Sequence, residues 1–145
     1  MSAEIEVIPT VPLEWEELKK VTDESIEIVE SVQGFAFQIA FRDKSFRVLN
    51  MESLEDFEIH SPIEYLEEKR SGFIDIEVLA RGWEKVGYSY SVAPDGNYED
   101  PDFVDLVAMI AEATQGIILN IESIWSWSVG LATPKELIAR SAVLR

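Results

Sequence analysis

The carboxylates Asp75 and Glu77 stand two residues apart in the segment FIDIEVLA, where acidic and apolar residues alternate. Alternation of this kind predicts a β-strand with both carboxylates on one face. They would then stand roughly 7 Å apart, which suits a general acid and base at a glycosidic bond or two oxygen ligands of Mg²⁺. A solvated acidic strand face explains the same pattern without catalysis. Asp75 and Glu77 are therefore an acid/base or metal pair only in a secondary hypothesis.

Most other familiar catalytic chemistry lacks its residues in this chain. There is one histidine, His60, and no cysteine, which excludes zinc sites built from several His or Cys ligands and leaves no cysteine nucleophile. The G-x-S-x-G, G-x-G-x-x-G and G-K-[ST] sequences of hydrolase elbows and phosphate-binding loops are absent. We expect no cofactor, and the balance favours a protein that is not an enzyme.

Aromatic residues spaced two apart are a second group of candidates. Tyr88 and Tyr90 occur in KVGYSYSVA, and Trp125 and Trp127 in SIWSWSVG. The spacing predicts that each pair projects from one face of a strand, and neighbouring strands would join the four rings into one wall. Such a wall is either core or a surface on which rigid rings anchor a partner. Because FAFQIAFR already supplies a core wall, we interpret the Tyr and Trp pairs as a partly exposed contact surface.

Charge is the strongest compositional feature of the chain. Its 28 acidic and 12 basic residues give a formal net charge of −16. Such a field repels nucleic-acid phosphates and anionic lipid and favours a basic protein partner. We expect no nucleic-acid binding. An acidic cluster that would contact a basic partner comprises Glu52, Glu55, Asp56 and Glu58.

Membrane association is not expected either. The N-terminus has no basic stretch leading into an apolar run, and the longest strongly apolar run, 106–111, is too short to span a bilayer. The absence of cysteine is compatible with a reducing compartment. We expect a cytoplasmic protein without a membrane anchor.

Turn and cap signals divide the chain into the elements that must position these residues. Prolines after a capping residue predict helix starts at Ser61, Asp100 and Thr133, and the second of these helices is expected to end at a left-handed Gly116. A short amphipathic helix is expected after Pro12. The strands are expected near 4–8, 25–29, 35–42 and 45–50, with a turn at 43–44, and near 73–80, 85–93, 117–120 and 123–129.

This order predicts one α+β domain over residues 1–145. Short connections between consecutive strands favour a mainly antiparallel sheet of about six strands, with three to four helices on one face or at its ends. The primary functional hypothesis is a non-enzymatic interaction module, immunity or inhibitor-like, that masks a basic partner. The alternative is a small-molecule or carbohydrate-binding protein, or a metal-dependent carboxylate enzyme, that uses the aromatic surface. In a third hypothesis the rings meet a second copy in a homo-oligomer.

Overall fold

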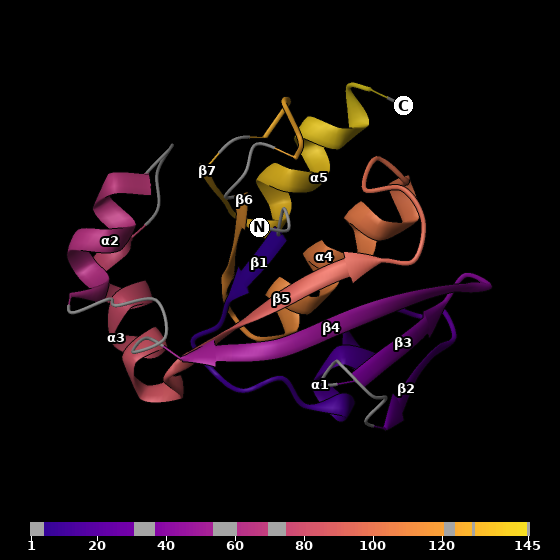
Figure 1. The fold of residues 1–145 in the computed structure, drawn as a ribbon, viewed down its shortest axis with the longest axis horizontal. Coiled ribbons are helices and arrows are strands. Elements are labelled where there is room, and N and C mark those ends of the chain that lie inside the picture. The colour runs from indigo at the N-terminus through magenta and orange to yellow at the C-terminus, as the bar shows by residue number, and fades with distance from the viewer. Residues whose placement is uncertain are drawn as a thin grey trace.

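Seven strands form one antiparallel sheet in the computed structural model, which describes residues 5–30, 37–53, 61–69, 75–120, 124–128 and 130–144. Their order across the sheet is β2-β3-β4-β5-β1-β6-β7 (Figure 1). The strands are β1 (Ile5–Ile8), β2 (Ile26–Glu30), β3 (Phe37–Phe41), β4 (Lys44–Ser53), β5 (Tyr88–Pro94), β6 (Ile117–Asn120) and β7 (Gly130–Ala132). The helices are α1 (Trp15–Lys20), α2 (Pro62–Lys69), α3 (Ile76–Val86), α4 (Pro101–Ala113) and α5 (Pro134–Ala142). The expected α+β class with a mainly antiparallel sheet is confirmed.

The β2-β3-β4 meander follows the predicted alternation, although β3 lies second from an edge and not at the centre of the sheet. Ile39 and Phe41 are buried and Ala40 between them is exposed, as period two requires. The β3–β4 turn is one residue earlier than expected. Arg42 and Asp43 occupy it with φ values of 52° and 60°, the left-handed pair of a two-residue hairpin turn.

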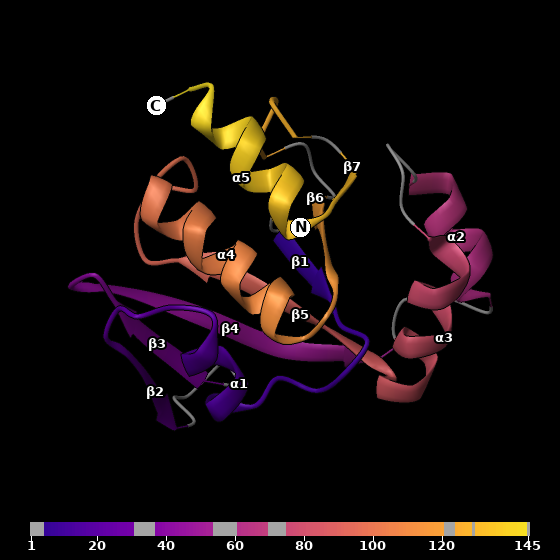
Figure 2. The same cartoon turned by 180° about the vertical axis from the view of Figure 1, so that it is seen from behind.

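Three helices, α1, α4 and α5, cover one face of the sheet, as the view from behind shows (Figure 2). α4 carries most of this core because its predicted apolar stripe is buried against the strands. The stripe comprises Phe103, Leu106, Val107, Ile110 and Ala111. α1 adds the buried Leu18 and α5 adds Leu137.

The opposite face is covered at the β6–β7 end of the sheet by α2 and α3 (Figure 1). Ile8, Ile117 and Leu131 pack there against a helical layer that includes Leu66 and Trp83. β1 is therefore buried on both sides, as an interior strand covered by helices on each face requires.

Glu6 is buried on β1, although the alternation of Ile5 and Val7 with glutamates is typical of a strand that buries only one face. Its side chain is 2% exposed, and its Oε2 accepts a hydrogen bond of 3.2 Å from the Ser89 hydroxyl. A buried carboxylate of this kind needs such polar partners. The sequence of β1 does not indicate burial of its second face, because the helices that cover this face come from distant segments of the chain.

The three predicted helix starts are confirmed. The Ser61 hydroxyl accepts from the Glu64 amide, the Asp100 carboxylate accepts from the Asp102 amide, and Thr133 forms a complete capping box. No helix in the described part of the chain is long and apolar enough to cross a membrane.

Gly116 was expected to supply the left-handed residue after α4, and this is wrong. Gln115 takes that conformation, with φ 49°. A Cβ on residue 116 would instead lie 2.9 Å from the Ile8 carbonyl carbon, 3.0 Å from Pro9 Cα and closer still to the Ile8 oxygen. Glycine is required at 116 by the close approach of β1.

Candidate functional site: an apolar groove along α4 with an acidic end

Arg42 joins the β3–β4 turn to α4 and to the start of β2. Its Nε and Nη2 donate to the two oxygens of Glu24 at 2.8 and 2.6 Å, and its Nη1 donates to Asp102 at 2.8 Å and to Asp105 at 2.7 Å. The bidentate geometry with Glu24 uses the guanidinium fork. All of the described Arg42 nitrogens therefore point at carboxylates, and the cation is held within the protein's own acidic groups.

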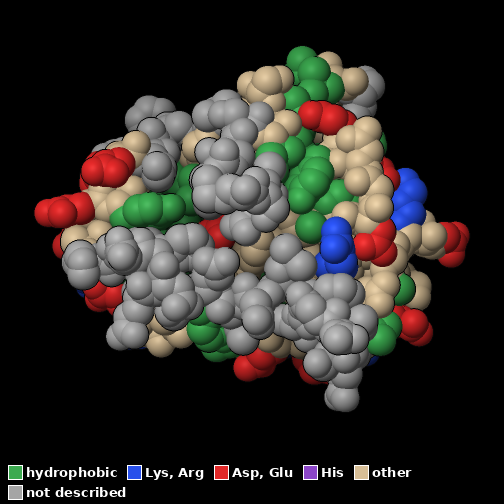
Figure 3. Space-filling view, in the orientation of Figure 1, with side chains coloured by type: hydrophobic (Ala, Val, Ile, Leu, Met, Phe, Trp, Pro, Cys, Tyr) green, Lys and Arg blue, Asp and Glu red, His purple; other side chains and the backbone are tan. Residues whose placement is uncertain are grey.

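Lys44 extends this arrangement along the first turn of α4. Its Nζ lies 2.7 Å from Asp100 Oδ2 and 2.7 Å from Asp102 Oδ2. We call the four carboxylates and two cations the ion-pair cluster: Glu24, Asp100, Asp102 and Asp105 with Arg42 and Lys44. Acidic groups outnumber basic groups by two, so the cluster is net negative. Figure 3 shows acidic and basic side chains gathered at the hairpin end of the molecule.

The pKa values of the cluster reflect these contacts. Hydrogen bonds from Lys44 and then Arg42 lower the pKa of Asp102, and the hydrogen bond from Arg42 lowers the pKa of Glu24. The hydrogen bonds to Asp100 and Asp102 raise the pKa of Lys44. Asp102 and Glu24 are therefore ionised at neutral pH.

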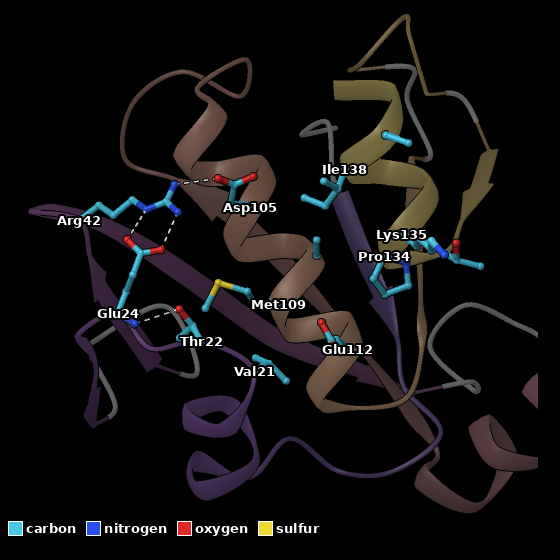
Figure 4. Close-up of a pocket in the computed structure, with 13 residues that line it drawn as sticks. Val21, Thr22, Glu24, Arg42, Asp105, Met109, Glu112, Pro134, Lys135 and Ile138 are labelled. Carbon is cyan, nitrogen blue, oxygen red and sulfur yellow. Dashed lines mark hydrogen bonds and ion pairs between the residues drawn. The ribbon is translucent and has the colours of Figure 1, made fainter. Parts of the chain in front are cut away.

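A groove of about 840 Å³ begins beside the ion-pair cluster and runs along α4 (Figure 4). α4 lines it with Asp105, Ala108, Met109 and Glu112, which are spaced i, i+3, i+4 and i+7 and thus form a stripe along two turns. This stripe lies outside the predicted core stripe of α4. The sequence indicates this second stripe through Ala108 and Met109. They are apolar residues in addition to the single apolar stripe that a helix buried on one side needs.

The walls of the groove come from α5 and from the α1–β2 connection. α5 contributes Pro134, Ile138 and Ala139, and the connection contributes Val21, Thr22 and Glu24. Ile138 exposes 38% of its surface although it is a large apolar residue. Apolar side chains therefore dominate the groove, with charged groups at its ends.

Charge at the groove's ends is unequal. The Arg42 end contains Glu24 and Asp105, which already share that cation. At the other end, Glu112 makes no ion pair or hydrogen bond through its side chain with any described residue, and Lys135 likewise has none. Glu112 is therefore an exposed carboxylate of the groove that is available to a cation of a partner protein.

The tryptophan pair does not lie on a strand, so that expectation is wrong. Residues 124–128 form a turn after β6, held by the Asn120 amide, which donates to the carbonyl oxygens of Trp125 and Ser128 at 2.8 Å each. The indoles of Trp125 and Trp127 still share a side, with ring centroids 5.1 Å apart in a stacked arrangement. Hydrogen bonds from a side chain to the backbone hold residues 124–128 in a turn, where alternation alone predicted a strand.

Trp125 is a core residue and not an exposed ring. It is 0% exposed, packs against Phe103 with the two rings tilted by 57°, and donates its indole N–H to the Tyr98 carbonyl at 2.8 Å. Trp127 is partly exposed, donates to Glu99 Oε2 at 3.2 Å and lines a second hollow of about 410 Å³. Of this pair, Trp127 alone presents surface to a partner, and its contact role remains a prediction.

The tyrosine pair lies on β5 as predicted, but it does not join the tryptophans in one wall. β1 lies between β5 and β6, so the two aromatic pairs are not on neighbouring strands. Tyr90 is 3% exposed and its oxygen accepts from the Leu13 amide at 3.0 Å, while burial raises the pKa of its hydroxyl. Tyr88 is partly exposed and meets Tyr90 edge-on. Tyr90 therefore packs in the core, and only Tyr88 keeps a surface available for contact.

Asp75 and Glu77 lie at the start of α3 and not on a strand, so the strand-face pairing is wrong. Asp75 is the N-cap and its Oδ1 accepts from the Val78 amide at 3.2 Å, whereas Glu77 pairs with Arg81 one turn later at 3.2 Å. Both positions are the ones at which a helix favours acidic residues. The helical stripe continues through Leu79 to Trp83, and this longer period was the signal that short alternation concealed.

The remaining predicted contact residues fall largely outside the described structure. Glu52 lies in β4, paired in register with Ser89, but its side chain is not described. Glu55, Asp56, Glu58 and His60 lie outside the described residues. Among the side chains that are described, no group of three or more acidic or histidine residues is arranged to hold a metal ion. The assignment of Glu52, Glu55, Asp56 and Glu58 to a partner stays a prediction.

Comparisons of this chain with known protein families, with curated proteins and with solved structures gave no match.

Proposed function

We propose that this protein is a cytoplasmic, non-enzymatic interaction module, immunity or inhibitor-like, that binds and masks a basic protein surface. One observation carries the proposal: on the α4 surface, an apolar groove lies directly beside an ion-pair cluster in which carboxylates outnumber cations. Specific interfaces combine an apolar centre that excludes water with a charged rim. The α4 surface has both parts.

The net charge of −16 adds long-range attraction to this local arrangement. A strongly acidic surface steers a basic partner into encounter and raises the association rate, and salt screens that effect. The carboxylates already bound to Arg42 and Lys44 hold their negative charge in place, because those ion pairs fix their side chains. The acidic end is therefore preorganised before a partner arrives.

The test begins with a tagged pull-down from lysate of the source organism, washed at low and then high salt, with the bound proteins identified by mass. The captured partner is then purified and its association rate measured against the wild type, Asp43→Asn and Glu112→Gln. Both substitutions remove an exposed carboxylate: Glu112 lies on α4 at the groove, and Asp43 lies in the β3–β4 turn next to Arg42, where Asn tolerates the left-handed conformation. Glu68→Gln on α2 is the matched control because it removes an exposed charge elsewhere.

We expect the association rate to fall severalfold at low salt for Asp43→Asn and Glu112→Gln, and to stay unchanged for Glu68→Gln. High salt should reduce the difference between the variants, since screening weakens exposed charge interactions. An association rate that responds neither to salt nor to Asp43→Asn and Glu112→Gln would refute an acidic binding surface.

A small-molecule-binding function is the second candidate, and the groove volume favours it. About 840 Å³ lies within the range of ligand pockets, roughly 300–1,000 Å³. The version with Asp75 and Glu77 as an acid/base pair has weaker support, because both carboxylates serve the start of α3. A thermal-shift screen of carbohydrates and other small ligands tests this candidate, and ligand-induced stabilisation that Ile138→Ser removes would favour it over protein binding.

A further inference from the structure

The shape of the groove indicates what kind of protein segment it accommodates. The α4 stripe of Asp105, Ala108, Met109 and Glu112 spans seven helical steps, which corresponds to about 10 Å of helix axis at 1.5 Å per residue. α5 lines the same groove with Lys135, Ile138 and Ala139 at helical spacing. The groove is thus bounded by two helical ridges, the arrangement into which a third helix packs.

Small and adaptable residues line the part of the groove where such a helix would approach. Ala108 and Ala139 leave room close to the α4 and α5 backbones. Met109 is partly buried, and its flexible thioether adapts to different apolar partners. Ile138 offers its exposed side chain from the opposite wall (Figure 4).

Backbone chemistry favours a helix over an extended segment as the occupant. An extended peptide needs an open sheet edge with which to exchange main-chain hydrogen bonds. Two of the groove's three walls are α4 and α5, whose peptide groups are already paired within each helix, and the first turn of α5 is closed by the Thr133 capping box. A helix satisfies its own main chain and binds through side chains alone.

Charge decides between a second copy of this chain and a different partner. A second copy of this chain carries the same net charge of −16, so it would be repelled from a net-negative end of the groove. The groove has the net-negative ion-pair cluster at one end, and Glu112 with the cation Lys135 at the other. A basic helix complements the cluster end and supplies a cation to Glu112.

We propose that the α4–α5 groove binds an amphipathic, basic α-helix of the partner, whose apolar stripe packs on Met109 and Ile138 and whose Lys or Arg side chains reach Glu112. This inference rests on the proposed function, because it specifies how the basic partner is held. Recognition follows the helix-in-groove mode, with apolar anchors on one helix face.

Three synthetic peptides serve as probes. The first is a Leu/Lys peptide with leucines at i, i+3, i+4 and i+7. The second is the same peptide with one central leucine replaced by proline, and the third carries Glu in place of every Lys. Proline breaks the helix without changing the charge, and Glu reverses the charge without changing the helical pattern. Binding is measured by fluorescence anisotropy of the labelled peptide and by the NMR shift of the Met109 methyl group, assigned through Met109→Leu.

The protein variants separate the groove from the rest of the acidic surface. Ile138→Ser removes apolar surface from the groove without changing charge, and Val78→Ser on α3 is the matched control because Val78 is also an exposed helical apolar residue, at 59%. We expect the basic helix to bind, to shift the Met109 signal, and to lose about tenfold in affinity with Ile138→Ser but not with Val78→Ser. The proline and Glu peptides should bind at least about tenfold more weakly than the basic helix, since one lacks the helix and the other repels the acidic ends.

Equal binding of the proline peptide, or unchanged affinity with Ile138→Ser, would overturn the helix-in-groove inference. So would failure of the basic helix to bind more tightly than its Glu counterpart. These outcomes leave the proposed function standing if the captured partner still responds to salt and to Asp43→Asn. Loss of that salt response would refute the proposed function itself.

Discussion

Gly116→Ala tests the closest approach of two backbone segments in the fold. The added Cβ would lie 2.9 Å from the Ile8 carbonyl carbon and 3.0 Å from Pro9 Cα, and the atoms it meets are all main chain. Main-chain atoms of a central strand cannot rotate away as a side chain can, so β1 or the end of α4 must move. The Ile8↔Ile117 pairing of β1 with β6 lies directly beside the clash.

The expected cost follows from two opposing terms. Overpacking a filled site costs about 1–3 kcal/mol, and the rigid surroundings of residue 116 place it at the upper end. Alanine also restricts the unfolded chain, which offsets about 0.4–1 kcal/mol. We therefore expect a net loss of about 2–3 kcal/mol, or a fall in Tm of about 4–12 °C at roughly 2–4 °C per kcal/mol.

Thermal and urea unfolding of three glycine variants provide the assay. Gly87 has a φ of 84° with open space around it, so Gly87→Ala should cost about 1 kcal/mol through backbone strain alone. Gly96 has neither a positive φ nor a neighbour within 4 Å, and Gly96→Ala should be neutral or slightly stabilising. A Gly116→Ala protein as stable as Gly87→Ala would refute the close approach of β1.

Three further outcomes test the core, the ion-pair cluster and the start of α3. Trp125→Ala should lower the free energy of unfolding by about 3–5 kcal/mol, because it empties a fully buried site, and denaturant titration measures this. Contacts that depress the pKa values of Asp102 and Glu24 contribute stability above the ordinary values of 3.8 and 4.5, and that stability is lost as the pH falls through the lowered pKa values. Arg42→Met should therefore flatten the acid limb of a stability-against-pH profile, and an unchanged limb would contradict this. Asp75→Ala should cost about 1 kcal/mol of stability through the lost N-cap while partner affinity stays unchanged; a selective loss of affinity or activity would restore a functional role for Asp75.

The amino-acid sequence by itself determined the α+β class, the β2-β3-β4 meander and the helix starts at Ser61, Asp100 and Thr133. These features depend on local physics: alternation for a strand, and hydroxyl or carboxylate caps followed by proline for a helix. The acidic character of the surface also follows from composition alone, because the net charge of −16 does not depend on the fold.

Local pattern failed where one short stretch satisfies two periods. FIDIEVLA alternates like a strand, yet the apolar spacing from Ile76 to Trp83 is helical, and the longer pattern prevailed. SIWSWSV also alternates, but Asn120 holds the segment as a turn through its side-chain hydrogen bonds. In each case the deciding residue, Trp83 or Asn120, lies outside the short alternating stretch.

Only the tertiary structure decided which surface is available for binding. Trp125 and Tyr90 became core because α4 and the connection before α1 pack over them, whereas Met109 and Ile138 became a groove because α4 and α5 meet there beside the α1–β2 connection. The ion-pair cluster likewise joins Arg42 to Glu24, 18 residues earlier in the chain, and to Asp102 and Asp105, 60 and 63 residues later. Burial and juxtaposition are set by contacts between distant segments, so residue type and spacing identified the candidates but could not determine which of them face the solvent.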